Sequence, residues 1–148
     1  LGLQSIQHML QLFSRLGLLT SSMHCIDTDE LIPAPAQGAL GVECRADDAE
    51  VLSVLGQLDA AEARLPSTAE RAVLRELGAT CATAAGAHAL LSDGMLTLRA
   101  DVMSTTGLER ILVEQSVPCA TVTDADSAGV VVAQALLVEG AAALVELR

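Results

Sequence analysis

The stretch "GAHALLSDGMLTLRADVMSTTGLERILVEQSV", residues 86–117, decides the fold that the sequence predicts. It holds three short runs rich in Val, Leu and Ile, and residues of this kind favour strands. Asp93-Gly94 separates the first two runs, and residues 105–107, "TTG", separate the second and third. Short glycine-containing connections of this length are typical of tight turns between antiparallel strands. We therefore expect a meander of three antiparallel strands.

A helical pattern precedes this meander. Residues 67–78, "STAERAVLRELG", begin with Ser67 or Thr68, and Glu70 follows closely, which matches the capping box that starts many helices. Gly78 is a suitable helix end, because glycine adopts the left-handed backbone that terminates a helix. The sequence predicts a helix from Ser67 to Gly78.

A second helical pattern follows the meander. Residues 124–147, "DADSAGVVVAQALLVEGAAALVEL", predict a helix that is capped by Asp124 or Asp126 and broken near Gly140. Two helices and three antiparallel strands form a compact α+β unit, which we place at residues 59–148.

Residues 1–58 have a different organisation. Residues 3–16 have helical spacing and end at Gly17, prolines 33 and 35 stiffen an extended loop, and residues 39–45, "ALGVECR", suggest a strand. Asp47 and Asp48 would then begin a helix that runs to about Leu58. This part has too few strands to close a core alone, so we interpret it as the end of an α/β domain.

Composition excludes several classes of function. The chain has 148 residues, a net charge of −11, no lysine and one aromatic residue, Phe13. Nucleic-acid binding needs clustered cations and usually stacking aromatic rings, so we expect no nucleic-acid partner. No apolar run approaches the roughly 20 residues that span a bilayer, and the start has no secretory signal pattern. We expect a soluble cytosolic protein.

Few residues suggest chemistry. The three histidines, His8, His24 and His88, stand apart without metal-binding spacing and are most simply surface or core residues. Two stretches stand out. The first is "PAPAQGALGVECR", residues 33–45, in which Gln37 and Gly38 would let an amide side chain and backbone N–H groups approach a ligand. Its structural alternative is a tight loop that leads into a strand.

The second stretch is the loop around Cys81. The small neighbours of Cys81 would leave its sulfur accessible, as a nucleophilic thiol requires, although a lone cysteine is more often a small buried hydrophobic residue. The other three cysteines are expected to be packing residues. Cys44 would share a strand face with Leu40 and Val42, Cys119 ends the third strand, and Cys25 lies beside Ile26.

Three segments resemble one family, the porphobilinogen deaminases, also called hydroxymethylbilane synthases. "LIPAPAQGALGVECRADD" is similar to the family's "LPAPGQGALGIECR", and "STAERAVLRELGATCATAAGAHA" resembles its "TAER…L-E-G-G-C-Q-V-P-I-G-A" segment. "DGMLTLRADVMSTTG" resembles the family's hairpin. The family's Gly-Gly before the cysteine is Ala79-Thr80 here, and residues 82–85 replace its Gln-Val-Pro-Ile.

The resemblance implies a fold and a cofactor. Residues 1–58 would end the family's second domain, which has a periplasmic-binding-protein-like α/β fold, and residues 59–148 would be its third domain. Cys81 would hold a dipyrromethane cofactor through a thioether, with Gln37 and Gly38 in the cofactor-binding region. A soft thiolate captures the electrophilic azafulvene that a pyrrole forms when its methylene loses ammonia or water.

The resemblance also implies an activity. The complete enzyme would join four porphobilinogen molecules into hydroxymethylbilane and release ammonia, as a cytosolic monomer in tetrapyrrole and haem biosynthesis. The family's catalytic aspartate and most of its anion-binding cations belong to an N-terminal half that this chain lacks, so the chain alone should be inactive. The alternative is a truncated or diverged domain that keeps the fold and serves only in binding or structure.

Overall fold

The structure is a computed structural model that describes residues 13–18, 20–21, 23 and 26–145. Its centre is the expected meander, with β1 (Ala85–Ser92), β2 (Met95–Met103) and β3 (Arg110–Pro118) in the antiparallel order β1-β2-β3. Asp93 and Gly94 both have positive φ, 52° and 74°, as a two-residue turn of this kind requires. The prediction from the turn residues is confirmed.

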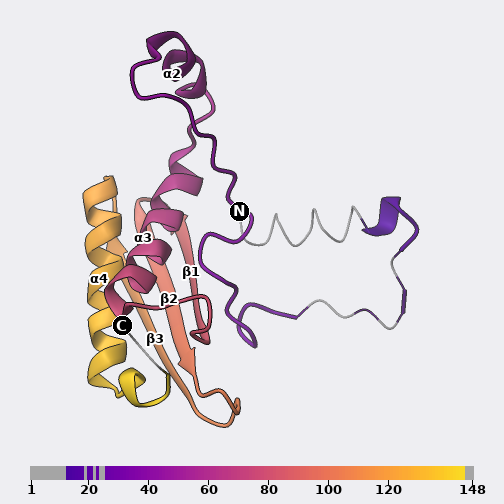
Figure 1. Ribbon diagram of the computed structural model, residues 1–148, viewed down its shortest axis with the longest axis vertical. Helices are drawn as coiled ribbons and strands as arrows, with labels where there is room; N and C mark the ends of the chain where they lie inside the picture. The colour runs from indigo at the N-terminus through magenta and orange to yellow at the C-terminus, as the bar shows by residue number, and fades with distance from the viewer. Residues whose placement is uncertain (1–12, 19, 22, 24–25, 146–148) are drawn as a thin grey trace.

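Two long helices cover one face of this sheet, α3 (Ala61–Leu77) and α4 (Val122–Val138), and none of the described helices lies on the other face (Figure 1). The helices approach each other closely at Gly129, where an added Cβ would lie 2.3 Å from the carbonyl oxygen of Ala69. A glycine is therefore needed at this contact. A short 3-10 helix, Ala141–Ala143, ends the described chain.

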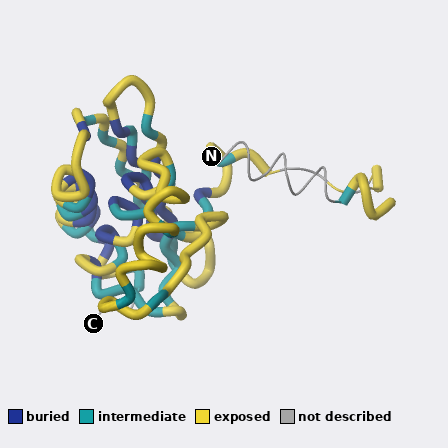
Figure 2. The backbone as a smooth tube through the Cα atoms, turned by 90° about the horizontal axis from the view of Figure 1, so that it is seen from above, coloured by how far each residue is buried: buried dark blue, intermediate teal, exposed yellow. Residues whose placement is uncertain are grey.

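The core lies between these helices and the sheet and is aliphatic. Alternate residues of β2 face the helices and are fully buried or nearly so: Leu96, Leu98, Ala100 and Val102. Figure 2 shows the buried residues gathered in the helices and strands of this C-terminal unit. The expected small domain with a three-stranded antiparallel sheet and helices is confirmed.

The start of α3 differs from the prediction. The helix begins at Ala61, six residues before Ser67, and includes Pro66. The hydroxyls of Ser67 and Thr68 donate to carbonyl oxygens one turn earlier, at 2.7 and 2.8 Å, so neither residue is a cap. Glu70, the expected partner in the capping box, is buried instead. The predicted end is correct, since Gly78 has a left-handed φ of 63°.

The last helix is close to expectation. Its N-cap is Thr121 rather than Asp124 or Asp126, and Asp124 completes a capping box by accepting from the backbone N–H of Thr121. The break near Gly140 is confirmed, because α4 ends at Val138 and Gly140 has a φ of 99°.

The first part of the chain lacks the expected strand. Residues 39–45 have no strand partner, and Leu40 and Val42 are 96% and 66% exposed. Helix α2 (Ala49–Leu55) does form, with Asp48 as its N-cap accepting from the N–H of Val51, but it ends three residues before Leu58 and buries no residue. Of the helix predicted at residues 3–16, residues 3–12 lie outside the described part of the chain, and residues 13–15 are helical.

Candidate functional site

Cys81 lies in the turn that connects α3 to β1, and its side chain is exposed. Two threonines shape this turn. The N–H of Thr80 donates to the hydroxyl of Thr83 at 2.9 Å, and the N–H of Ala82 donates to the hydroxyl of Thr80 at 3.2 Å. These bonds are local and the neighbouring residues are small, which agrees with the exposure of Cys81.

The turn does not depend on the glycines of the family pattern. Positive φ occurs at Gly78 just before the turn, but neither Ala79 nor Thr80 has it. These positions accept ordinary side chains without the strain that a left-handed backbone would impose.

The other cysteines differ from Cys81 in burial. Cys119 is 3% exposed, and burial raises the pKa of its thiol, so its predicted packing role is confirmed. Cys44 is half-buried, but the strand that was expected to hold it is absent. Cys25 lies outside the described residues. Among the described cysteines, Cys81 is the exposed one.

A segment of the first part, extended at residues 32–34 and turning at residues 35–38, lies along the outer edge of β1 (Figure 1). Ile32 is 5% exposed, and the carbonyl oxygen of Pro33 accepts from the N–H of Ala87 at 3.1 Å. An added Cβ at Gly86 would lie 2.7 Å from the carbonyl oxygen of Ile32. Glycine at position 86 therefore allows this segment to approach the sheet.

Gln37 and Gly38 lie in this turn and are exposed. The N–H of Gln37 donates to Ala34 at 3.1 Å, and Gly38 has a φ of 84°. The segment runs along β1 from Gly86 and Ala87 toward Ala89. Gln37 and Gly38 follow the contact near Ala89. Cys81 lies at the other end, before β1 begins. The structure does not bring the three predicted site residues together.

Glu70 is a functional candidate that the sequence did not reveal. Its carboxylate accepts from the N–H of Ala36 at 2.6 Å and from the N–H of Ala89 at 2.7 Å. Burial raises the pKa of Glu70, and the two backbone hydrogen bonds oppose that shift. The Nδ1 atom of His88 lies 3.7 Å from the carboxylate. Burial is the main cause that lowers the pKa of His88, and Arg99 is among the positive charges that add to it. His88 is thus held mainly neutral.

A charged network lies on the helix-free face of the sheet. Asp101, 1% exposed, accepts from the N–H of Gly86 at 3.1 Å and from Nε of Arg110 at 2.7 Å. Arg110 also donates to the carbonyl oxygen of Glu30 at 3.3 Å. Arg99 pairs with Glu114 at 3.1 Å and also with the exposed Asp29. These arginines are engaged within the chain.

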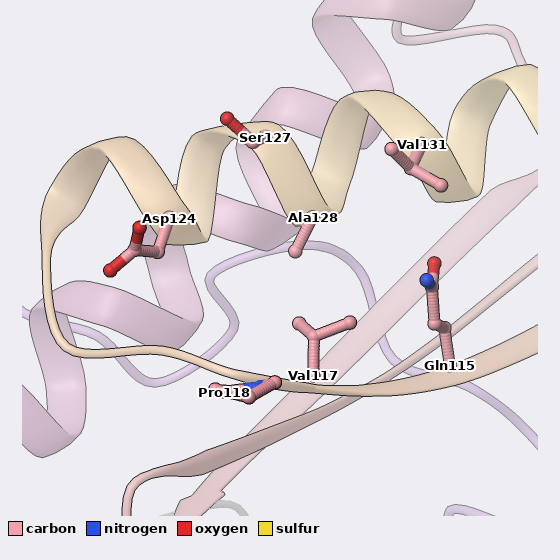
Figure 3. Close-up of a pocket in the computed structure, with 7 residues that line it drawn as sticks. All are labelled: Gln115, Val117, Pro118, Asp124, Ser127, Ala128 and Val131. Atoms are coloured by element: carbon pink, nitrogen blue, oxygen red, sulfur yellow. The ribbon is translucent and has the colours of Figure 1, made fainter.

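A shallow groove between β3 and α4 is a separate feature (Figure 3). Val117, Ala128 and Val131 give it an apolar lining. Its one carboxylate, Asp124, already caps the first turn of α4. Within the described ranges, no group of three His, Cys, Asp or Glu side chains is placed to hold a metal ion. The same residues contain no helix that is long and apolar enough to cross a membrane.

These observations define an α+β module that presents a single thiol at a helix-to-strand turn and binds an extended segment along its edge strand. Comparison with known families is specific. The model described as "Porphobilinogen deaminase, C-terminal domain" matches residues 65–138, and the model described as "Porphobilinogen deaminase, dipyromethane cofactor binding domain" matches residues 12–53.

Curated relatives agree with the family models. A porphobilinogen deaminase of Corynebacterium diphtheriae is 40% identical over 107 residues, which are 72% of this chain and 36% of that protein. One of Coxiella burnetii is 49% identical over 84 residues, 57% of this chain and 27% of that protein. One of Desulforudis audaxviator is 43% identical over 104 residues, 70% of this chain and 34% of that protein.

The chain belongs to the porphobilinogen deaminase family. It spans about a third of the length of the curated relatives it matches.

Proposed function

We propose that this chain is the C-terminal part of a hydroxymethylbilane synthase and that Cys81 carries its dipyrromethane cofactor. The exposed sulfur of Cys81 is the observation that carries this proposal, together with the match of residues 12–53 to the cofactor-binding model. The complete protein would join four porphobilinogen molecules and release ammonia. We place the boundary between its second domain, periplasmic-binding-protein-like in fold, and its third domain at residues 58–59.

The residues around Cys81 fit a covalent pyrrole group. The turn offers a sulfur without bulky neighbours, and a thioether is stable to hydrolysis, so the thiol would be a permanent anchor. When bound, the dipyrromethane supplies the anchored pyrrole to which further units are joined. Gln37 and Gly38 would contribute polar contacts in the cofactor-binding region of the complete protein.

The charges of the chain support the expectation that it is inactive alone. Pyrrole substrates of this class carry several carboxylates, which need free cations. The net charge is −11, and five of the eight arginines already pair with carboxylates of the chain: Arg45, Arg64, Arg75, Arg99 and Arg110. The cationic wall of the cleft would come from the N-terminal half, and the assembled protein would work as a cytosolic monomer.

Mass spectrometry of the chain co-expressed with the N-terminal half of a relative tests this proposal. We expect a dipyrromethane adduct that maps to the peptide containing Cys81, and no adduct on a Cys81→Ser chain. A matched Cys44→Ser chain should keep the adduct. An unmodified chain in a stable complex with that half would instead favour the alternative, a domain that keeps the fold and serves only in binding or structure.

A further inference from the structure

Within the described part of the chain, two charged side chains are buried, Glu70 at 6% exposure and Asp101 at 1%. Glu70 binds the segment that precedes the C-terminal unit directly, and Asp101 is linked to its beginning through Arg110. Burying a carboxylate costs free energy unless hydrogen bonds compensate it. Their partners therefore indicate what these two residues hold in place.

Glu70 joins three parts of the chain that are distant in sequence. It projects from α3, and its two oxygens accept separately from Ala36, 34 residues earlier, and from Ala89 in β1, 19 residues later. Hydrogen bonds to a charged acceptor are short and strong, and these are 2.6 and 2.7 Å long. One side chain thus connects the segment, the helix and the edge strand.

Further contacts hold the beginning of the same segment. Ile32 is buried against Gly86, and the carbonyl oxygen of Pro33 extends the hydrogen bonding of β1 through the N–H of Ala87. Asp101 orients Arg110, which donates to the carbonyl oxygen of Glu30. The contact at Ala36 is the last of this series and lies within the turn, residues 35–38, that contains Gln37 and Gly38.

We infer that Glu70 is a positioning residue that fastens residues 33–36 to the edge of β1 and thereby sets where the turn of Gln37 and Gly38 lies relative to Cys81. The importance of that placement for the cofactor rests on the proposed function. The attachment itself is independent of the proposed function, since it can be measured in this chain without any ligand.

Backbone hydrogen exchange of a Glu70→Gln chain tests the inference. Glutamine keeps the shape of the side chain but is uncharged and offers one oxygen, so one of the two N–H groups loses its acceptor and the other keeps only a weaker one. We expect the Ala36 and Ala87 amides to exchange about tenfold faster or more, while the amides of Leu98 and Ala100 in β2 keep their protection. A matched Glu76→Gln change, on the exposed side of the same helix, should alter neither group.

Unchanged exchange at Ala36 and Ala87 would overturn the inference. Equal acceleration in β2 would also overturn it, because Glu70 would then support the whole core rather than place the segment.

A second variant covers the case in which Glu70→Gln does not fold. Replacing the Ala36 backbone amide with an ester removes the donor N–H and leaves the C-terminal unit unchanged, and the chain can be assembled by ligation at Cys44. Faster exchange at Ala87 supports the attachment, and unchanged exchange there contradicts it. Neither result depends on whether Cys81 binds a cofactor, so failure of the proposed function would be seen separately by mass spectrometry.

Discussion

The two parts of this chain, residues 1–58 and 59–148, both contain apolar residues but differ in how many of the described ones are buried. Ile32 is the one buried hydrophobic residue among the described residues before Leu65, whereas the sheet and helices that follow bury an aliphatic core. Leu40, Val42 and Leu58 are as apolar as the core residues but lie exposed at 96%, 66% and 71%. Hydrophobic residues alone therefore do not make a folded unit, because each apolar face also needs a partner.

The largest expected difference between the two parts is in their resistance to protease. Residues 59–148 should remain as a folded fragment, while the first cuts should fall between residues 37 and 60, where the chain is exposed and buries no side chain. Limited proteolysis with mass mapping measures this. First cuts within the meander, at residues 90–115, would show that the division is wrong.

The second largest difference between the two parts should be in the loss of stability when a leucine is replaced by alanine. Leu98→Ala removes a side chain that is 1% exposed and should lower the free energy of unfolding by about 2–5 kcal/mol. Leu40→Ala, at a position 96% exposed, should leave it unchanged. Chemical denaturation gives both values. A similar loss at the two positions would mean that residue 40 also packs in the folded chain.

Replacing a glycine by alanine in each part should give a smaller difference in stability. Gly129→Ala places a Cβ 2.5 Å from the Cβ of Ala72 and should cost about 1–3 kcal/mol by forcing α3 and α4 apart. Gly41→Ala meets no atom within 4 Å and should have no cost. Thermal unfolding of both variants checks this pair, and a stable Gly129→Ala chain would contradict the close helix contact.

The smallest expected effect concerns pH and His88. Because the pKa of His88 is lowered in the folded chain, mainly by burial, the unfolded chain binds more protons as the pH falls through 6.5. His88 should therefore lower the free energy of unfolding as the pH falls through 6.5. Glu70 acts in the opposite direction, since its pKa is raised and stability is lost as the pH rises through it.

Comparison with a His88→Gln chain isolates the contribution of the histidine, since Glu70 is present in both proteins. The wild-type chain should lose more stability than the variant between pH 7 and pH 5 in urea titrations. Equal losses would mean that His88 takes up its proton as readily in the folded as in the unfolded chain.

Local signals predicted the C-terminal unit well. The turn residues Asp93 and Gly94 act on their immediate neighbours, so the hairpin could be predicted from sequence, and Gly78 ends its helix for the same reason. The start of α3 could not be found this way, because its N-cap, Ala60, makes no side-chain bond. Tertiary contacts also draw Glu70 inward and away from the expected capping box.

The candidate site was predictable only in part. Small neighbours correctly indicated an exposed Cys81. The strand expected at residues 39–45 is wrong because a strand needs a partner, and pairing is not encoded in the pattern of Val42 and Leu40. The role of Glu70 depends on two amides that lie 34 and 19 residues away, and no local pattern indicates such contacts.

The segment that Glu70 holds also has a protective effect. β1 is an edge strand, and its outward N–H groups at Ala87 and Ala89 are occupied by Pro33 and Glu70. Uncovered edges of this kind pair readily with other chains. A fragment that begins at residue 59 keeps Glu70 on Ala89 but loses Pro33, which frees the N–H of Ala87 at this edge, so we expect it to fold and to self-associate as its concentration rises. We therefore expect the attachment at Ala36 to limit aggregation through this strand.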